Sequence, residues 1–267
     1  MKDKLVKIYL DIETAPGIWP AFRCGDVYLD QDNMLEDTSI FMIQWQVEGE
    51  NTVHTRDITD FAGWEKRGWR DDRLLSSLAG ELLNSADIVI GQNSKRFDEK
   101  WIKGRLAKHG WGQVGGYISH DTLLVARKNY YLTSYKLDYL GKFFGFGGKV
   151  HTDFSWWKEL ITSAQDKDWD KFKARIEKFK KYGKRDVVLL RKVYKEMCKT
   201  CPEFRNPPTL GSAADGCPQE GCSGKLLKNG TRFIRTAQQV YQRYVCNKCG
   251  AQVRGHKGLL TQRDRLV

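Results

Sequence analysis

Three segments of the sequence carry carboxylates and a tyrosine at spacings that would hold them near one another. Asp11 and Glu13 close an apolar stretch, and residues two apart on a strand project from the same face. Asp98 stands where a helical pattern begins after a short apolar run. Tyr182 and Asp186 are four residues apart, about one helical turn. Grouped carboxylates are the ligands that the hard cations Mg²⁺ and Mn²⁺ prefer, so the chemistry they suit is metal-assisted.

Each segment also has a purely structural explanation. Asp11 and Glu13 could be the polar end of a strand that leads into a turn, and the charge of Asp98 would suit the positive end of a helix dipole. Asp186 is harder to explain in this way, because it extends the apolar stripe of its helix. That stripe comprises Leu190, Val193, Tyr194 and Met197. A carboxylate on a buried face needs a partner, and a cation would provide one.

In their order, spacing and context these segments resemble the DEDD superfamily of 3′→5′ exonucleases. The branch they resemble is the tyrosine branch (DEDDy), which includes polymerase proofreading domains. Asp11 and Glu13 match the first family motif, D-x-E, and Asp98 matches the aspartate of the second. Tyr182 and Asp186 match the third motif, Y-x-x-x-D. The segment that begins at His120 also looks like this family, but we assign no chemistry to it.

The resemblance implies a two-metal mechanism and a role for each matched residue. Two Mg²⁺ or Mn²⁺ ions about 3.5–4 Å apart activate a water and stabilise charge on the attacking and leaving oxygens. By resemblance, Asp11 bridges the two ions, Glu13 and Asp186 hold the ion on the nucleophile side, and Asp98 holds the other. Tyr182 orients the attacking water. The function implied is hydrolysis of phosphodiester bonds at a 3′ end, preferably of single-stranded DNA.

Two other classes of function stay open at the level of the sequence. One is a nucleic-acid-binding protein in which a zinc ribbon binds the ligand and the nuclease fold is a scaffold. The other is an exoribonuclease or an endonuclease that uses the same metals. Four acids distinguish neither DNA from RNA nor exonucleolytic from endonucleolytic cleavage. The expected partner in every case is nucleic acid, with single-stranded DNA first and RNA second.

Four of the seven cysteines form a CxxxxC…CxxC set near the end of the sequence. Its members are Cys217, Cys222, Cys246 and Cys249. Four thiolates complete a tetrahedral site and leave no open position, so the pattern predicts one structural Zn²⁺. A further CxxC, Cys198 and Cys201, has no second pair and is interpreted as two ordinary thiols.

The region around and beyond these cysteines is strongly basic. Residues 223–267 contain ten Lys and Arg but one acid, out of a formal net charge of +12 for the whole chain. Basic and aromatic side chains alternate there, a mixture that suits backbone neutralisation and base stacking. The alternative is that the aromatics pack the small ribbon core. The residues expected to contact nucleic acid are Arg232, Arg235, Arg243 and Tyr244, together with Asn93 of the second motif.

The elements that must position these residues alternate along the first two thirds of the chain. Strands are predicted at residues 5–12, 40–47, 53–58 and 87–90, with a strand or strand–helix junction at 117–126. Helices are predicted at 73–86 and 97–109, then around 136–144, 169–181 and 182–198. This order predicts a mixed α/β sheet flanked by helices. With the resemblance, the expected fold class is an RNase H-like sheet plus a small C-terminal four-cysteine zinc ribbon.

The length and composition of the chain limit the number of domains and the kinds of location that can be expected. The chain has 267 residues, enough for one good-sized domain and a small module. Proline placement divides the chain into a first domain at 1–200, a linker rich in turn formers at 201–216 and a second domain at 217–267. By resemblance the first is the nuclease domain, and the cysteines make the second a zinc ribbon with a basic tail. No apolar stretch reaches about 18 residues, so no membrane partner is expected. The start lacks the pattern of a secretory signal, which predicts a cytoplasmic location.

Overall fold

The computed structural model describes residues 6–22, 30–112, 114, 116–148, 153–204, 216–217, 222–235, 240–250 and 252–258. Within the last three ranges, it describes only the backbone for residues 229–235, 240–241, 243 and 252–258. The chain divides into two compact units, one at Lys4–Thr200 and the other from Cys201 onward. Among the described residues, no helix combines the length and the apolar character that crossing a membrane requires.

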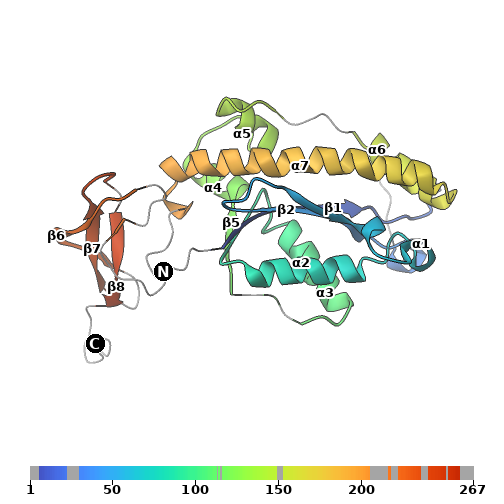
Figure 1. Cartoon of the computed structure of the whole chain (residues 1–267), viewed down its shortest axis with the longest axis horizontal. Helices are drawn as coiled ribbons and strands as arrows, with labels where there is room; N and C mark the ends of the chain where they lie inside the picture. The colour runs from blue at the N-terminus through green and yellow to red at the C-terminus, as the bar shows by residue number, and fades with distance from the viewer. Residues whose placement is uncertain are drawn as a thin grey trace. The chain divides into compact units, whose positions relative to one another are not determined.

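The larger unit is built on a five-stranded sheet in the order β3-β2-β1-β4-β5 (Figure 1). Its strands are β1 (Lys7–Ala15), β2 (Ser39–Val47), β3 (His54–Asp57), β4 (Ile88–Gly91) and β5 (Ile118–Asp121). β2 runs antiparallel to both β1 and β3, whereas β1, β4 and β5 run parallel to one another. The prediction of an RNase H-like mixed sheet with flanking helices is confirmed.

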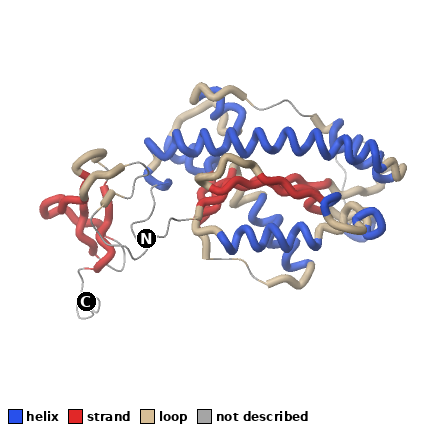
Figure 2. The backbone as a smooth tube through the Cα atoms, viewed as in Figure 1, coloured by secondary structure: helices blue, strands red, loops and turns tan. Residues whose placement is uncertain are grey.

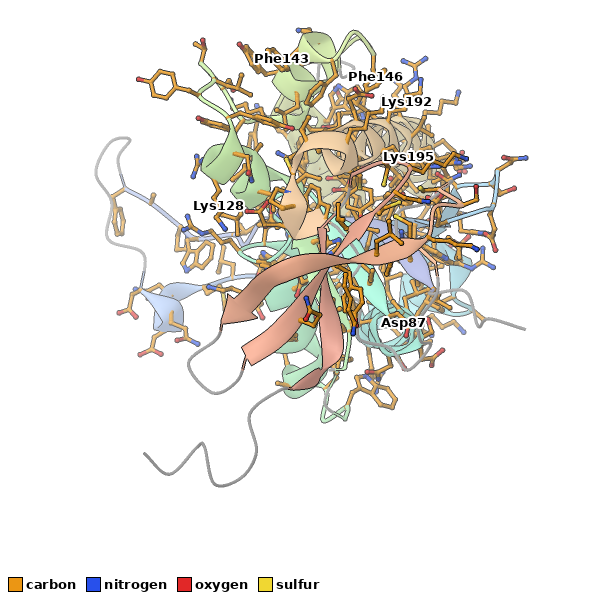
Figure 3. All side chains as sticks on the ribbon, turned by 90° about the vertical axis from the view of Figure 1, so that its left-hand side faces the viewer. Asp87, Lys128, Phe143, Phe146, Lys192 and Lys195 are labelled. Atoms are coloured by element: carbon orange, nitrogen blue, oxygen red, sulfur yellow. The ribbon has the colours of Figure 1, made fainter. Side chains whose placement is uncertain are left out.

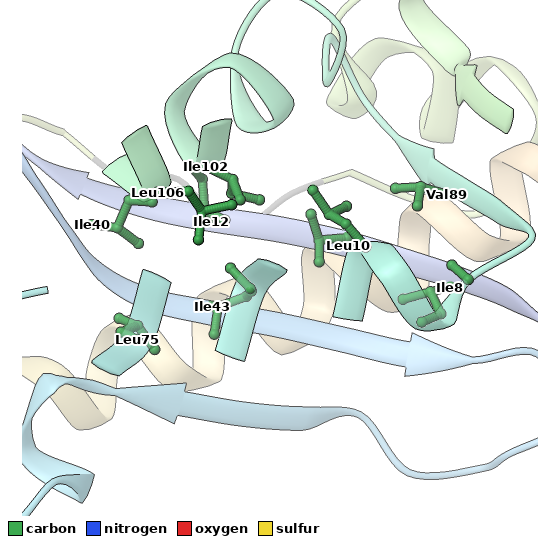
Figure 4. Close-up of a cluster of buried hydrophobic side chains, with 12 residues drawn as sticks. Ile8, Leu10, Ile12, Ile40, Ile43, Leu75, Val89, Ile102 and Leu106 are labelled. Carbon is green, nitrogen blue, oxygen red and sulfur yellow. The ribbon is translucent and has the colours of Figure 1, made fainter. Parts of the chain in front are cut away.

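Helices cover both faces of this sheet, as the layers in Figure 2 show. On one face lie α2 (Arg73–Ser85) and α3 (Asp98–Lys108), and their apolar side chains meet those of β1 and β2 in one buried cluster (Figure 4). β1 contributes Ile8, Leu10 and Ile12 to that cluster. Side chains alternate along a strand, so Asp11 and Glu13 belong to the opposite face.

The opposite face is covered by α7 (Trp169–Thr200), which packs on β1, β2 and β3. The sequence predicted two helices here, at 169–181 and 182–198, and that prediction is wrong, because α7 is continuous through Gly183. Glycine inside a helix costs about 1 kcal/mol relative to alanine. Here the missing side chain lets α7 approach the sheet, since a Cβ at Gly183 would overlap the side-chain amide of Gln44 on β2.

Shorter elements complete the larger unit. They are α1 (Trp64–Arg67), α4 (Thr122–Asn129), α5 (Leu137–Phe143) and α6 (Ser155–Gln165), with 3₁₀ turns at Gln31–Asn33 and Ile58–Asp60. The sequence did not predict α6, which packs against α7 through the rings of Trp156 and Trp157 on Phe179.

The smaller unit contains a three-stranded antiparallel sheet, β6-β7-β8. Its strands are β6 (Leu226–Arg235), β7 (Val240–Cys246) and β8 (Gln252–Gly258). The stretch predicted as a linker begins with a 3₁₀ turn, Pro202–Phe204, in which Phe204 is buried, as is Cys201 just before it. Residues 205–215 of that stretch lie outside the described residues.

Candidate active site and cysteine cluster

The carboxyl ends of the parallel strands β1, β4 and β5 lie at the same edge of the sheet. Crevices at such edges are the usual ligand sites of open α/β sheets. β4 pairs with β1 only as far as Ile90, opposite Tyr9, so β1 extends beyond its neighbour. Asp11 and Glu13 lie on this extension. β1 therefore presents its two carboxylates where β4 no longer covers it.

Asp98 joins this extension of β1 directly. It is the first residue of α3, the helix that follows β4. The backbone N–H of Ile12, which lies between Asp11 and Glu13, donates to Asp98 Oδ1 at 3.1 Å. This bond connects segments 86 residues apart in the sequence. The first and second motifs therefore meet at one point of the fold.

A further acid, Asp121, fixes the loop that precedes Asp98. Its Oδ1 accepts the backbone N–H of Asn93 at 3.0 Å, and its Oδ2 accepts that of Lys95 at 3.1 Å. Asp121 also caps α4 by accepting the N–H of Leu123. Asn93 has a φ of 63°, an unusual value for a residue other than glycine. No role was predicted for Asp121 from the sequence, in which its place directly after His120 was the available signal.

The electrostatics around Asp98 oppose its ionisation. Asp98 is 3% exposed, and burial raises the pKa of its carboxyl well above the ordinary value. The negative charge of Asp11 raises this pKa further, and that of Asp121 adds to it, against the lowering effect of the backbone hydrogen bonds. A bound cation would reverse the effect, since an opposite charge favours the ionised form. The donor set and its electrostatics therefore fit a hard divalent cation.

Glu13 lies at an irregularity of the sheet. The β1–β2 register shifts between Glu13 and Thr14, so that Glu13 pairs with Met42 while Thr14 pairs with Ile40. Bulges of this kind twist a strand and re-aim its side chains, and they are common beside active sites. The side chain of Glu13 is 8% exposed, whereas that of Asp11 is half-buried.

The third motif lies on the sheet-facing side of α7. Asp186 is 3% exposed, and the half-buried ring of Tyr182 packs edge-on against Trp156 at 6.3 Å between centroids. Gly183 approaches Gln44, the register partner of Asp11, and Tyr194 packs its ring on Tyr9 of β1 at 5.7 Å.

Asp186 lies between these two contacts along the helix. Asp186 is therefore on the side of α7 that packs on β1 and β2.

The four cysteines of the smaller unit come together. Among the described residues they form the one group of three or more possible ligands whose donor atoms all lie within 4.8 Å of one another. The Sγ atoms of Cys217 and Cys249 are 3.5 Å apart, and those of Cys222 and Cys246 are 3.7 Å apart. Such a group could hold a zinc ion.

The local backbone favours a thiolate at Cys246. Cys246 Sγ accepts the N–H groups of Lys248 and Cys249 at 3.4 and 3.5 Å. These bonds, that of Cys249 first, lower the pKa of the Cys246 thiol to about 6. Gly224 leaves room for the sulfur, because a Cβ there would overlap Cys246 Sγ. A deprotonated, closely surrounded sulfur is the form in which cysteine ligates metal.

The structure describes the side chains of only some of the residues that are expected to contact nucleic acid. Tyr244 lies on β7 and is half-buried. Arg232 and Arg235 belong to β6 and Arg243 to β7, but their side chains lie outside the described residues. That prediction therefore stays a prediction.

No family model matches the chain, and no curated protein matches it. Among solved structures it is similar to the family B DNA polymerase from the hyperthermophilic archaeon Pyrobaculum calidifontis, with a TM-score of 0.49 and 14% sequence identity. The match covers 73% of this chain and 25% of the polymerase chain, so this chain spans about a quarter of the length of that structure.

Proposed function

We propose that the protein is a metal-dependent 3′→5′ exonuclease that hydrolyses phosphodiester bonds, preferably in single-stranded DNA. The observation that carries the proposal is the bond from Ile12 N–H to Asp98 Oδ1. It brings Asp98, the aspartate of the second motif, to the backbone between Asp11 and Glu13. Burial and the nearby charge of Asp11 disfavour the ionised form of Asp98 there. A buried carboxylate with a perturbed pKa, beside other acids, is typical of functional sites.

In this proposal some residues bind the metal ions and others hold reacting groups in position. Asp11, Glu13, Asp98 and Asp186 would hold two Mg²⁺ or Mn²⁺ ions. When bound, such ions make water a stronger nucleophile and offset charge on the reacting oxygens. Asp121 holds the β4–α3 loop, and with it Asp98, in place. The hydroxyl of Tyr182 would accept or donate one hydrogen bond to the attacking water and so fix its direction.

The decisive experiment uses strands labelled at one end. Oligonucleotides of DNA and of RNA, each labelled at the 5′ or the 3′ end, are incubated with the full chain and Mg²⁺ or Mn²⁺. A ladder of 5′-labelled products shortened from the 3′ end, with release of labelled mononucleotide from the 3′ end, supports the proposal. Internal fragments would indicate an endonuclease, and activity restricted to RNA an exoribonuclease. Asp11→Asn is the control for contaminating nucleases, and full activity in that variant would refute the site.

Tyr182→Phe tests the tyrosine separately from the metal ligands. The change keeps the ring and its packing on Trp156 but removes the hydroxyl. Positioning and acid–base groups contribute about 10²–10⁴-fold, and a group that only orients water belongs at the low end. We expect kcat to fall about 100-fold with little change in KM or melting temperature. A variant as fast as the wild type at saturating substrate would show that Tyr182 does not orient the water.

A further inference from the structure

A cleft on the larger unit lies between α7 and the loop that follows α5. Its volume is about 370 Å³, within the range of about 300–1,000 Å³ that small-ligand sites occupy. We call it the α5–α7 cleft. Its lining residues are Phe146, Gly148, Lys184, Arg185, Val188, Leu189 and Lys192. None of these belongs to the proposed metal centre, although Arg185 directly precedes Asp186 on α7.

The three cations of the cleft form no ion pair with an acid among the described residues. The lining contains no acidic side chain, and among the described residues no carboxylate comes within 4.0 Å of the charged groups of Lys184, Arg185 or Lys192. Other cations on α7 do have such partners: Lys195 pairs with Glu48 at 2.7 Å, for example. Lysines on a solvated face are common, but three cations around one cleft that pair with no described carboxylate favour an anionic occupant.

The spacing of these cations suits an extended anion. Lys184 and Lys192 are eight residues apart on one helix, which corresponds to about 12 Å along its axis. A chain of phosphates could contact every cation of this row, and each contact would release a counterion.

The loop after α5 forms an aromatic wall of the cleft, and α7 adds Val188 to its apolar lining. Phe146 is 36% exposed and Val188 is 40% exposed, although both are large hydrophobic residues. Phe143, 53% exposed, lies nearby, and both phenylalanines pack their rings against Phe144. Figure 3 shows Phe143, Phe146 and Lys192 on the same side of the unit. Exposed aromatic rings beside a row of cations are what single-stranded nucleic acid stacks on.

The aromatic wall is held in place by its own backbone. The N–H of Phe146 donates to the carbonyl of Gly141 at 2.8 Å, and that of Gly145 donates to the carbonyl of Lys142 at 3.0 Å. Gly145 and Gly147 have φ values of 80° and 83°, which a residue with a side chain rarely adopts. These hydrogen bonds and glycine conformations fix the backbone of the loop, which lowers the entropic cost of binding.

We propose that the α5–α7 cleft binds a single-stranded segment of the nucleic acid substrate, outside the metal centre. The inference rests on the proposed function for the identity of that substrate. Lys184, Arg185 and Lys192 contact successive phosphates, while a base stacks on Phe146. An acidic polypeptide would satisfy the cations but offers no flat ring to the aromatic wall. A duplex keeps its bases stacked inside and cannot offer them to Phe146.

The first test removes two of the cations. The double variant Lys184→Ala/Lys192→Ala is compared with Lys171→Ala/Lys178→Ala, which removes two exposed lysines of the same helix away from the cleft. Binding of a fluorescent single-stranded oligonucleotide is measured by anisotropy across a salt series, with no divalent metal and no chelator added. Unchanged melting temperatures establish that both variants are folded.

The expected weakening follows from counterion release. Each phosphate contact contributes about −0.7 to the slope of log K against log[salt] on single strands. Removing two such contacts therefore flattens the slope by about 1.4, which is about 25-fold weaker binding at 0.1 M salt if the lines meet near 1 M. The control variant keeps the wild-type slope. Equal slopes and affinities in the two variants would overturn the proposal.

The second test concerns the aromatic wall. Phe146→Ala should weaken binding at least about fivefold for an ordinary strand, but leave binding of an abasic strand unchanged. The control is Tyr131→Ala, which removes a fully exposed ring elsewhere on the unit. If poly-glutamate binds as tightly as the oligonucleotide and Phe146→Ala changes neither, the cleft takes an acidic polypeptide and the proposal fails.

These binding measurements are independent of hydrolysis. If the chain cleaves no labelled strand but the cleft variants still lose affinity, the cleft proposal stands and the exonuclease proposal falls. If the chain cleaves strands while the cleft variants match their controls in affinity and KM, the exonuclease proposal stands and the cleft proposal falls.

Discussion

Asp98 combines two properties that oppose each other at the scale of a single residue. Its Oδ1 accepts the N–H of Ile12, which helps to hold α3 against β1. Its charge, however, is disfavoured by burial and by the nearby charge of Asp11, which together raise its pKa. Active sites often contain groups that lower the stability of the protein on its own and become favourable once a ligand binds.

Asp98→Asn should therefore stabilise the metal-free protein while it abolishes turnover. Asparagine keeps the acceptor oxygen for Ile12 N–H and removes the charge. If removing the buried charge stabilises the folded state by about 1 kcal/mol, the melting temperature should rise by about 2–4 °C in a unit of this size. The folded pKa of Asp98 is raised, so the wild type loses stability as pH rises from the unfolded value of 3.8 through the folded one.

The gain in stability of Asp98→Asn over the wild type should thus be larger at pH 7 than at pH 4. Thermal melts at both values, without added divalent cation, measure it. Added Mn²⁺ should stabilise the wild type more than the variant, because binding to the folded state alone raises its stability. Identical melting temperatures at both pH values would show that Asp98 carries no electrostatic penalty.

The sequence predicted the place of Asp98 at the start of a helix, but not the surroundings that disfavour its charge. The apolar pattern predicted Asp98 at the start of a helix, and α3 does begin there. Its hydrogen bond to Ile12 depends on where β4 ends, at Gly91. The repulsion between the charges of Asp98 and Asp121 depends on the pairing of β4 with β5. Both are contacts between distant segments, which local periodicity does not report.

At the scale of elements, the junction of α7 with β2 depends on one missing side chain. Gly183 allows the close approach, and Gln44 fills the space while its Nε2 donates to the carbonyl of Lys180 at 3.2 Å. Gln44 is 1% exposed, so displacing it would leave a buried amide to find new partners. Gly183 is flanked by Tyr182 and, one turn on, by Asp186. A shift of α7 at this point would move both.

Gly183→Ala should therefore destabilise the protein despite the better helix propensity of alanine. The propensity gain is about 1 kcal/mol, whereas a buried polar group that loses its partner costs about 1–3 kcal/mol. The matched control is Gly104→Ala on α3, an exposed helical glycine with nothing within 4 Å of an added Cβ, which should gain stability. Urea unfolding measures both, and a stabilised, fully active Gly183→Ala would contradict this account of the junction.

The same glycine explains why the sequence predicted two helices instead of α7. Propensity alone favours a break at Tyr182 and Gly183, since glycine is a poor helix former. Continuity comes from packing on the sheet, including the edge-on contact of Phe41 with Phe179 at 5.1 Å. The cysteine pattern, by contrast, was predictable, because four ligands at fixed short spacings specify their own geometry.

The cysteine cluster should determine the stability of the smaller unit. We expect one Zn²⁺ per chain when the protein is prepared without chelator, measured by elemental analysis. Removing it should unfold the three-stranded sheet, because small metal sites supply much of the folding energy of their domains. Cys246→Ser should lose the zinc, whereas Cys198→Ser, outside the cluster, should retain it. Zinc-free protein with an intact smaller unit would refute a structural role for the metal.

At the scale of the whole molecule, positive charge is unevenly distributed between the two units. Residues 223–267, within the smaller unit, hold ten Lys and Arg and one acid, a balance of +9 out of the formal +12. A bound zinc with four thiolates would carry about −2, which reduces this surplus without removing it. Charge of this size favours binding to a nucleic-acid backbone over long distances. The division of labour that this suggests is catalysis in the larger unit and retention of substrate by the smaller one.

Truncation after Asn206 tests this division. The truncated protein keeps all the acids of the proposed active site and the α5–α7 cleft, but lacks the cysteine cluster and the basic tail. If the tail holds the backbone far from the scissile bond, it stabilises ground and transition states alike, so KM should rise while kcat stays near its wild-type value. The slope of log K against log[salt] should flatten by about 0.7 for each single-strand phosphate that the tail no longer neutralises.

The competing role is a purely structural one, in which truncation lowers the melting temperature of the larger unit and reduces kcat because less of the protein is folded. Steady-state kinetics over a salt series, with a melt of each protein, separates the two. An unchanged KM and an unchanged slope would mean that the basic tail does not hold the substrate.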